Sequence, residues 1–489
     1  MKKTYIDTAM ERIAPDLILK GGNVVDVFSG KVIKADVIIK DGIICGVGSY
    51  SGENEQDVSG KYIMPGFIDS HVHIESSMTQ PSEYAKAVMP HGITTVIADP
   101  HEITNVCGED GLEFMLKSAK NIPLDVNLML PSCVPATPFE HTGANLDAKT
   151  TQKLAPKFFG IGEMMNYPGI VSGDDETLGK LCLDIIDGHA PLLSGHELDA
   201  YASAGIKTDH ECSVVEEMTE KISKGMYILL REGTLSLDVA KLIKGVTPYT
   251  LRRCAFCTDD RFVGEIIRDG SIDHCIRKAV SLGLNNIDAI IMATLNACEI
   301  YGMKNKGAIA PSYVADIVVA DDLNLSSISQ VYKNGKLVCE NGKALFECET
   351  VDNSKVTNTV HLPKISADFF KTDVKDKFDA IELIPESIIT KKVTVSYSDS
   401  LSKVCVIERH HNLGTKGIGF VTNYGITNGA IATSIGHDSN NVIVIGDNDS
   451  DMALAVNTLA TSGGIAVCSE GKVIASMTLD IAGLMSVKS

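Results

Sequence analysis

Three features are absent from this sequence: an excess of positive charge, a long apolar run and a regular cysteine framework. The 489 residues include 44 Lys and Arg against 63 Asp and Glu, a formal net charge of −19 at pH 7. So acidic a chain is a poor candidate for binding a polyanion, and we expect no nucleic-acid partner. No apolar run is long enough to cross a bilayer, and none follows the first five residues, so neither membrane association nor a signal peptide is expected.

The 13 cysteines are odd in number and scattered, which predicts a reducing, cytoplasmic location. The single Cys-x-x-Cys pattern, Cys254 to Cys257, has no second pair, so two small buried strand residues are favoured over a metal-ligand pair. Hydrophobic residues make up 44% and charged residues 22% of the chain, as in ordinary globular proteins. The length is sufficient for two to four domains.

Two β-type segments flank the middle of the chain. Residues 16–47 alternate apolar and polar positions between turns expected at Gly21-Gly22 and Ser29-Gly30. A similar pattern returns over residues 315–338, where Asn334-Gly335 is a strong two-residue turn signal. We therefore expect the two flanks, residues 1–61 and 311–355, to form one small β domain.

Between the flanks, apolar strand-like segments alternate with helical patterns, which is typical of parallel β/α units. The predicted strands include residues 94–98, 125–130, 159–162, 228–230 and 254–257, and the predicted helices include residues 82–88, 111–119, 175–186 and 272–282. The predicted fold class is α/β, with a (β/α)8 TIM-type barrel over residues 62–310. Residues 356–489 differ in style, being β-rich and then glycine-rich, and are predicted to form a C-terminal α+β domain.

Within the segment Ile63 to Met78, Pro65-Gly66 is predicted to be a turn and a strand is predicted to start directly after it. Because side chains alternate along a strand, His71 and His73 point the same way and can bind one divalent metal. Two ordinary half-buried histidines are the alternative for this triplet considered alone.

Polar residues also follow the other predicted strands, at the end where a β/α barrel places its active site. Each of them alone has a plain structural explanation, such as a buried ion pair for Glu163 or a helix N-cap for Asp259. Their joint order within one barrel length indicates a metal site. They are Asp99, His101 and Glu102, then Glu163, His189, His210, Arg231, Glu232 and Asp259.

These motifs resemble the amidohydrolase superfamily. The stretches His71–Met78, Asp99–Glu102, Gly162–Asn166 and Gly195–Leu198 are most similar to the adenine deaminase family within it, as is the C-terminal segment. The resemblance implies two divalent metal ions, Mn²⁺ or Fe²⁺ with Zn²⁺ also able to occupy the site. The ligands that it implies are His71, His73, Glu163, His189, His210 and Asp259. Glu163 stands where many relatives have a carboxylated lysine, and a carboxylate can also span two cations.

The chemistry implied is hydrolytic deamination of free adenine to hypoxanthine and ammonia, as in purine salvage, by a metal-activated hydroxide that attacks C6. Asp259 is expected to accept the proton of the water, and Glu102 or Glu232 to protonate N1. His101 is either an additional ligand or a proton shuttle. The residues expected to bind substrate are Glu75, Asn166, Arg231, His437 and Asp438.

His437 and Asp438 belong to a polar turn, residues 437–441, between two apolar runs of the C-terminal segment. Such a turn either just closes a hairpin or reaches over the barrel mouth to exclude water and orient the purine ring. In the second case it acts in its own subunit or in a partner of a homo-oligomer, a dimer or larger, which we expect for this protein.

Three rival functions remain at this point. A hydantoinase or dihydroorotase-like cyclic amide hydrolase is disfavoured because no lysine stands at position 163. An N-acetylglucosamine-6-phosphate deacetylase would need phosphate-binding basic residues that the pattern does not provide. A non-catalytic scaffold on a decayed barrel is disfavoured because ligand-type residues remain at every expected strand end.

Overall fold

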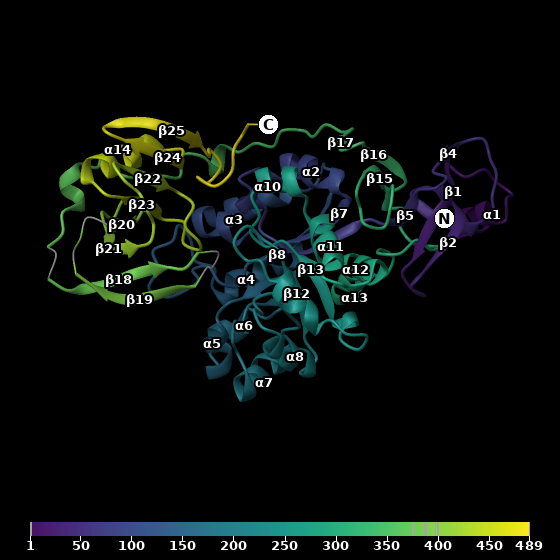
Figure 1. Cartoon of the computed structure of the whole chain (residues 1–489), viewed down its shortest axis with the longest axis horizontal. Helices are drawn as coiled ribbons and strands as arrows, with labels where there is room; N and C mark the ends of the chain where they lie inside the picture. The colour runs from purple at the N-terminus through teal and green to yellow at the C-terminus, as the bar shows by residue number, and fades with distance from the viewer. Residues whose placement is uncertain (1, 374–375, 386–388, 397, 399–400, 489) are drawn as a thin grey trace.

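The computed structural model describes residues 2–373, 376–385, 389–396, 398 and 401–488. Strands from two segments, residues 17–65 and 317–344, lie in one nine-stranded sheet, at the purple end of the molecule in Figure 1. The strands are β1 (Leu17–Asp26), β2 (Lys31–Lys40), β3 (Ile43–Gly48), β4 (Glu55–Asp57), β5 (Tyr62–Pro65), β14 (Ile317–Ala320), β15 (Ile328–Lys333), β16 (Lys336–Glu340) and β17 (Lys343–Ala344). The flanks meet where β5 pairs antiparallel with β14, with Ile63 opposite Val319.

One turn predicted in this sheet is wrong. Gly21 and Gly22 lie within β1 and form a bulge, at which the register with β2 shifts between Leu19 and Gly22. Gly21 has φ +70°, and a Cβ on Gly22 would lie 2.5 Å from Ile63 Cδ1. The glycines therefore allow a kink and a close approach inside one strand, whereas the turn at Asn334-Gly335 does join β15 to β16.

The middle of the chain forms a curled parallel sheet. One part, in the order β10-β9-β8-β7-β6, comprises β6 (Phe67–Val72), β7 (Ile93–Ala98), β8 (Asp125–Leu130), β9 (Gly160–Met164) and β10 (Ile186–Gly188). The other part comprises β11 (Thr208–Asp209), β12 (Tyr227–Arg231) and β13 (Cys254–Cys257). The parts meet where Lys207 N donates to Ile186 O at 3.3 Å, and where Val72 forms a parallel bridge with Asp259. Strands such as β6, β7 and β13 are buried along their whole length, as parallel strands covered by helices are.

Helices cover the outside of this curled sheet (Figure 1). They are α2 (Pro81–Val88), α3 (His101–Ser118), α4 (Ala148–Leu154), α5 (Tyr167–Ser172), α6 (Asp175–Gly179), α7 (Gly195–Ser203), α8 (Val215–Ser223), α9 (Val239–Leu242), α10 (Val263–Asp269), α11 (Ile272–Ser281), α12 (Asn286–Ala293) and α13 (Leu295–Ile300), with α1 (Lys2–Ala9) beside the first sheet. None of the described helices combines the length and apolar character that crossing a bilayer requires.

Three predicted elements have different bounds in the structure. The helix expected over residues 111–119 is α3, which already begins at His101 and ends at Ser118. The helix expected over residues 175–186 ends at Gly179, and its apolar end is β10, because Ile186 pairs in parallel with Ile161 of β9. The strand expected after Pro65-Gly66 begins at Phe67 as β6 but ends at Val72, and a 3₁₀ turn follows at Ile74–Ser77. Pro65 is not in a turn, because it is the last residue of β5. His71 therefore lies in β6, and His73 lies one residue beyond its end.

A further eight-stranded sheet lies on the other side of the curled sheet (green to yellow in Figure 1). Its strands are β18 (Phe378–Leu383), β19 (Thr390–Val395), β20 (Ser402–Ile407), β21 (Lys416–Thr422), β22 (Gly429–Thr433), β23 (Val442–Gly446), β24 (Gly464–Ser469) and β25 (Lys472–Thr478). Helix α14 (Asp449–Leu459) packs on it through an apolar core that includes Met452, Val456 and Val444. The hairpin β22–β23 carries the polar turn of residues 437–441.

Four charges join the first sheet to the curled sheet at the amino-terminal end of β8. Lys306 Nζ lies 2.5 Å from a carboxylate oxygen of both Asp125 and Asp316. Lys333 Nζ lies 2.7 Å and 2.6 Å from the same two oxygens. We call these four residues the basal cluster, in which each ammonium has two carboxylate partners.

Candidate metal centre and active site

Six potential ligands converge at the carboxyl ends of the parallel strands. Each stands at the end of its strand or one or two residues beyond it, which is where the β/α architecture places reactive groups. We call this set the ligand cluster: His71, His73, Glu163, His189, His210 and Asp259. All are buried except His189, which is partly exposed.

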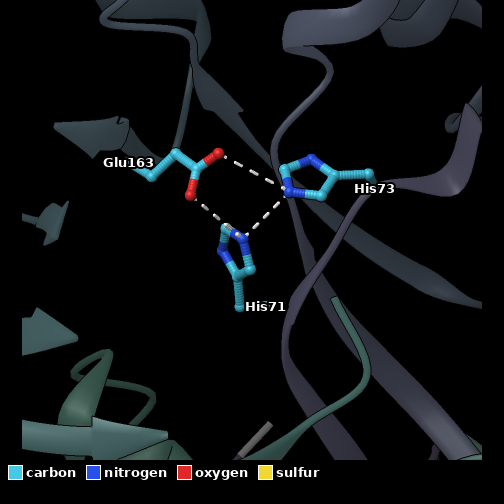
Figure 2. Close-up of side chains that lie close together, drawn as sticks. All are labelled: His71, His73 and Glu163. Atoms are coloured by element: carbon cyan, nitrogen blue, oxygen red, sulfur yellow. Dashed lines mark hydrogen bonds and ion pairs between the residues drawn. The ribbon is translucent and has the colours of Figure 1, made fainter. Parts of the chain in front are cut away.

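Glu163 lies between two pairs of histidines. Its Oε2 lies 3.7 Å from His71 Nε2, and its Oε1 lies 3.7 Å from His73 Nε2. Figure 2 shows the three side chains directed at one another. On the other side, His189 Nδ1 and His210 Nε2 are both 2.9 Å from Glu163 Oε2. Burial acts to raise the pKa of Glu163, but the adjacent His189 and His210 hold it well below its ordinary value, so the carboxylate is anionic.

Asp259 closes the cluster opposite Glu163. Its Oδ1 lies 3.1 Å from His73 Nε2 and 3.8 Å from His71 Nε2. Its Oδ2 accepts a hydrogen bond from Arg231 Nη1 at 2.9 Å. Burial acts to raise the pKa of Asp259, but His73 and Arg231 hold it well below its ordinary value. A second anionic oxygen therefore faces the histidines.

The arrangement of the histidine nitrogens fits a divalent cation. His73 Nδ1 is 2.8 Å from Asp99 O, and since a carbonyl only accepts, this nitrogen carries the proton and Nε2 presents a lone pair. His71 Nε2 lies 3.1 Å from His73 Nε2. Two nitrogens this close need a proton or a shared cation between them. Donors bound to one ion by bonds of about 2.1 Å lie roughly 3 to 3.4 Å apart. The donors of His71, His73 and Glu163 lie within 4.8 Å of one another, as do those of Glu163, His189 and His210.

Three other predicted site residues lie beside the cluster. His101 Nδ1 is 3.3 Å from Glu163 Oε1, and its Nε2 is 3.1 Å from Glu102 Oε1. Glu75 accepts from Ile103 N at 3.2 Å through Oε1, while its buried Oε2 has no partner among the described residues. Burial raises the pKa of Glu75 to about 7, so at neutral pH this group carries a proton part of the time.

Two predicted site residues make other contacts. Arg231 is buried and donates to Asp259, Glu211 and Asp238, so its guanidinium is occupied by carboxylates. Asn166 is the N-cap of α5 and accepts from Gly169 N at 3.1 Å.

Glu232 faces away from these groups. It pairs with Lys278 Nζ of α11, on the outer side of the curled sheet. The strand pattern places Glu232 beyond β12 but does not tell on which side of the barrel wall the carboxylate lies.

The C-terminal hairpin reaches the same region. His437 Nδ1 contacts Glu102 Oε1, and Asp438 Oδ1 lies 3.7 Å from His101 Nε2. The side chains of His437 and Asp438 are 39% and 30% exposed, so both are partly open to solvent while they contact the buried residues Glu102 and His101.

Three carboxylates beside the ligands have contacts that the sequence did not predict. Asp99 Oδ2 accepts from Glu163 N at 2.9 Å, and Glu211 Oε1 lies 3.6 Å from His210 Nε2. Asp209 Oδ2 accepts from fully buried Lys221 at 3.0 Å and from Ala190 N at 3.0 Å, so it holds the loop after His189. Asp209 and Glu211 flank His210 in the sequence, and Asp99 directly follows β7, which are the signals that could have identified their contacts.

Two family models match the chain. The amidohydrolase family matches residues 62–338, and the adenine deaminase C-terminal domain matches residues 383–489. The chain is 47% identical to the adenine deaminase of Clostridium acetobutylicum over 99% of this chain and 89% of that protein. The chain belongs to the adenine deaminase family. Membership implies a divalent metal, for which the ligand cluster supplies candidate donors.

Other similar proteins support the family assignment and the fold. Adenine deaminase 2 of Desulfotalea psychrophila is 45% identical over 99% of this chain and 88% of its own length. Among solved structures, an enamidase of the amidohydrolase superfamily aligns with a TM-score of 0.52 at 18% identity, covering 68% of this chain and all of its own. The enamidase supports the barrel-type fold only.

Proposed function

We propose that the chain catalyses the hydrolytic deamination of adenine to hypoxanthine and ammonia at the ligand cluster. The observation that carries this proposal is the joint match of barrel and C-terminal segment to adenine deaminases over almost the whole chain. Glu163 at the centre of four histidines supports the same function, because it stands where cyclic amide hydrolases would need a lysine.

The proposed centre holds two divalent ions per chain, Mn²⁺ or Fe²⁺ in preference, with Zn²⁺ able to replace them. His71 and His73 would hold one ion, His189 and His210 the other, with Glu163 between them and Asp259 beside the first pair. Nitrogen and oxygen donors without a thiolate are compatible with these metals. When bound, the ions make water a competent nucleophile near neutral pH.

Asp259 is the proposed acceptor of the proton that the attacking water loses. It is anionic, and Arg231 on Oδ2 leaves Oδ1 directed at the cluster. Arg231, expected from the sequence to bind substrate, is better assigned to positioning Asp259.

Glu102 is the proposed carboxylate for relaying protons to N1 and the leaving nitrogen. Burial acts to raise its pKa, but His437 and His101 hold it well below its ordinary value, so it is anionic and would take each proton from His101 before passing it on. Glu232 is disfavoured for this role because Lys278 binds it on the outer side of the curled sheet. Glu75 is the proposed partner for a nitrogen of the purine ring. Its Oε1 accepts from Ile103 N, next to Glu102 in the chain, and its Oε2 has no partner among the described residues. Asp438 remains a candidate substrate contact at the rim.

The test is ammonia release over a purine panel with added Mn²⁺, with metal content measured on the same samples. We expect turnover of adenine and none of adenosine. Comparable turnover of adenosine, or of a hydantoin, would overturn the substrate assignment. If the purified protein contains no metal and binds none when Mn²⁺ is added, the result would support a non-catalytic scaffold.

The domain division is also proposed: a closed (β/α)8 barrel over residues 62–310, a small β domain from residues 1–61 and 311–355, and a C-terminal α+β domain over residues 356–489. The antiparallel pairing of β5 with β14 supports the shared β domain. Limited proteolysis tests it, because removal of residues 1–60 without unfolding would contradict it. We further propose a homo-oligomer, which light scattering of the purified protein would detect.

A further inference from the structure

Two residues of the C-terminal hairpin bind the same carboxylate of the barrel. Glu102 Oε1 is contacted by His437 Nδ1, and Glu102 Oε2 accepts from Asn440 Nδ2. Asn440 stands 338 residues after Glu102 in the chain, and both side chains are buried. The proposed proton donor is therefore held at both oxygens by another part of the fold.

Asn440 is itself held rigidly within its loop. Its Oδ1 accepts from Gly436 N at 3.2 Å, and its Nδ2 also donates to Asp438 O at 3.0 Å. Its φ of +53° is a left-handed conformation that asparagine and glycine tolerate better than other residues. One amide thus connects the loop backbone to Glu102.

A buried arginine fixes this loop from behind. Arg409 is fully buried, and its Nε donates to Asn440 O, its Nη2 to Ala482 O at 2.9 Å and its Nη1 to Thr359 Oγ1 at 3.3 Å. No carboxylate pairs with this guanidinium among the described residues. A buried charge without a counterion is costly. The hydrogen bonds of Arg409 to three separate segments offset part of this cost and hold the Asn440 loop in place.

We infer that Asn440, supported by Arg409, is a positioning residue for Glu102, so that the C-terminal hairpin completes the active site of its own chain. This inference rests on the proposed function. A glutamate has three rotatable bonds, and a proton donor misplaced by about 1 Å loses much of its effect on rate. Two hydrogen bonds that restrain both oxygens select one orientation of the carboxylate.

The test compares Asn440→Gly and Asn440→Asp with wild type, using ammonia release from adenine, metal content and thermal melting. Glycine removes the amide without straining the left-handed backbone, and aspartate keeps the shape but places an anion against Glu102. We expect kcat to fall about 10- to 100-fold in both, with KM changed less than about threefold and metal content unchanged, since only a step after binding is affected.

Asn448→Ala is the matched control. Asn448 lies in the same sheet-and-helix unit, where it caps α14 by accepting from Asp451 N at 2.8 Å, and it makes no contact with Glu102. Loss of this cap should lower the melting temperature without changing kcat. Arg409→Lys should reproduce the kcat defect of the Asn440 variants at about tenfold, because a compact ammonium cannot reach three acceptors that bind three different nitrogens of the guanidinium.

Wild-type kcat in a folded Asn440→Gly variant would overturn the inference while leaving the proposed function intact. A rise in KM at unchanged kcat would also overturn it and would assign the hairpin to substrate binding. Wild-type protein that releases no ammonia from adenine would contradict the proposed function and, with it, this inference.

Discussion

The ligand cluster and the basal cluster lie at opposite ends of the parallel strands and use their charges differently. In the basal cluster, Lys306 and Lys333 each contact both Asp125 and Asp316. Beside the ligand cluster, the buried Oε2 of Glu75 has no hydrogen-bond partner among the described residues. The fully paired charges of the basal cluster join two parts of the fold, whereas a buried carboxylate oxygen without a partner beside the ligand cluster is available to a ligand.

Among changes that affect one of the two clusters, removal of metal from the ligand cluster should have the largest effect on activity. Chelation should lower adenine turnover at least a thousandfold, because the activated water supplies several kcal/mol of the barrier reduction. Added Mn²⁺ should restore turnover, as measured by ammonia release. Full activity in demonstrably metal-free protein would end the assignment of the ligand cluster as a metal centre.

Glu163→Gln should lower kcat at least a hundredfold and reduce bound metal, because the amide keeps the shape but loses the charge and one good metal oxygen. Elemental analysis and turnover together check this. Glu113→Gln is the control, since Glu113 forms an exposed pair with Lys117 on the surface of α3. A Glu163→Gln enzyme with full metal and normal turnover would falsify the bridging role.

Asp316→Asn should destabilise the fold by about 2 kcal/mol at pH 7 and leave kcat unchanged below the melting transition. The loss is smaller than for a fully orphaned buried charge, because Asp125 still pairs with both lysines. Asp321→Asn is the control, because its pair with Lys61 is exposed and contributes little.

The same variant gives a pH test by thermal melting. Burial acts to raise the pKa of Asp316, but Lys333 and Lys306 hold it below its ordinary value of 3.8. A depressed folded-state pKa contributes stability above pH 3.8 that is lost as the pH falls through the folded-state value. The gap between wild type and Asp316→Asn should therefore narrow on acidification below that pH, and a gap that widens would contradict the pairing.

Asp438→Asn should have the smallest effect, a change in kcat of about threefold or less. Asp438 is 30% exposed and lies 3.7 Å from His101, so solvent screens its charge. Steady-state kinetics beside those of Asn440→Gly measure the difference. If Asp438→Asn lowers kcat as much as Asn440→Gly does, the whole turn of residues 437–441 affects the rate, and not specifically the contact of Asn440 with Glu102.

Much of the fold was predictable because its signals are local. Apolar runs bounded by turn residues identified β7, β8, β12 and β13, and the resemblance to adenine deaminases is confirmed by relatives over almost the whole chain. Errors arose where one local pattern fits two structures. Apolar residues near Ile186 match a helix face as well as a parallel strand, and Gly21-Gly22 matches a turn as well as a bulge.

The roles of the strand-end residues were less predictable. Position in the sequence places Arg231 at the end of its strand and Glu232 and Glu102 beyond theirs, but their partners come from other elements. Lys278 draws Glu232 outward, Asp259 and Asp238 occupy Arg231, and the C-terminal hairpin holds Glu102. No local pattern specifies which of these long-range partners each side chain meets.

The sequence by itself determined the family, the alternation of strands and helices, and the residue types that can bind a metal, because these follow from periodicity and from motifs a few residues long. Only the tertiary structure decided that Glu163 lies among four histidines, that Glu75 keeps a free buried oxygen, and that Asn440 meets Glu102. Such contacts join segments far apart in the chain, and they are selected by packing and buried hydrogen bonding, which act in three dimensions.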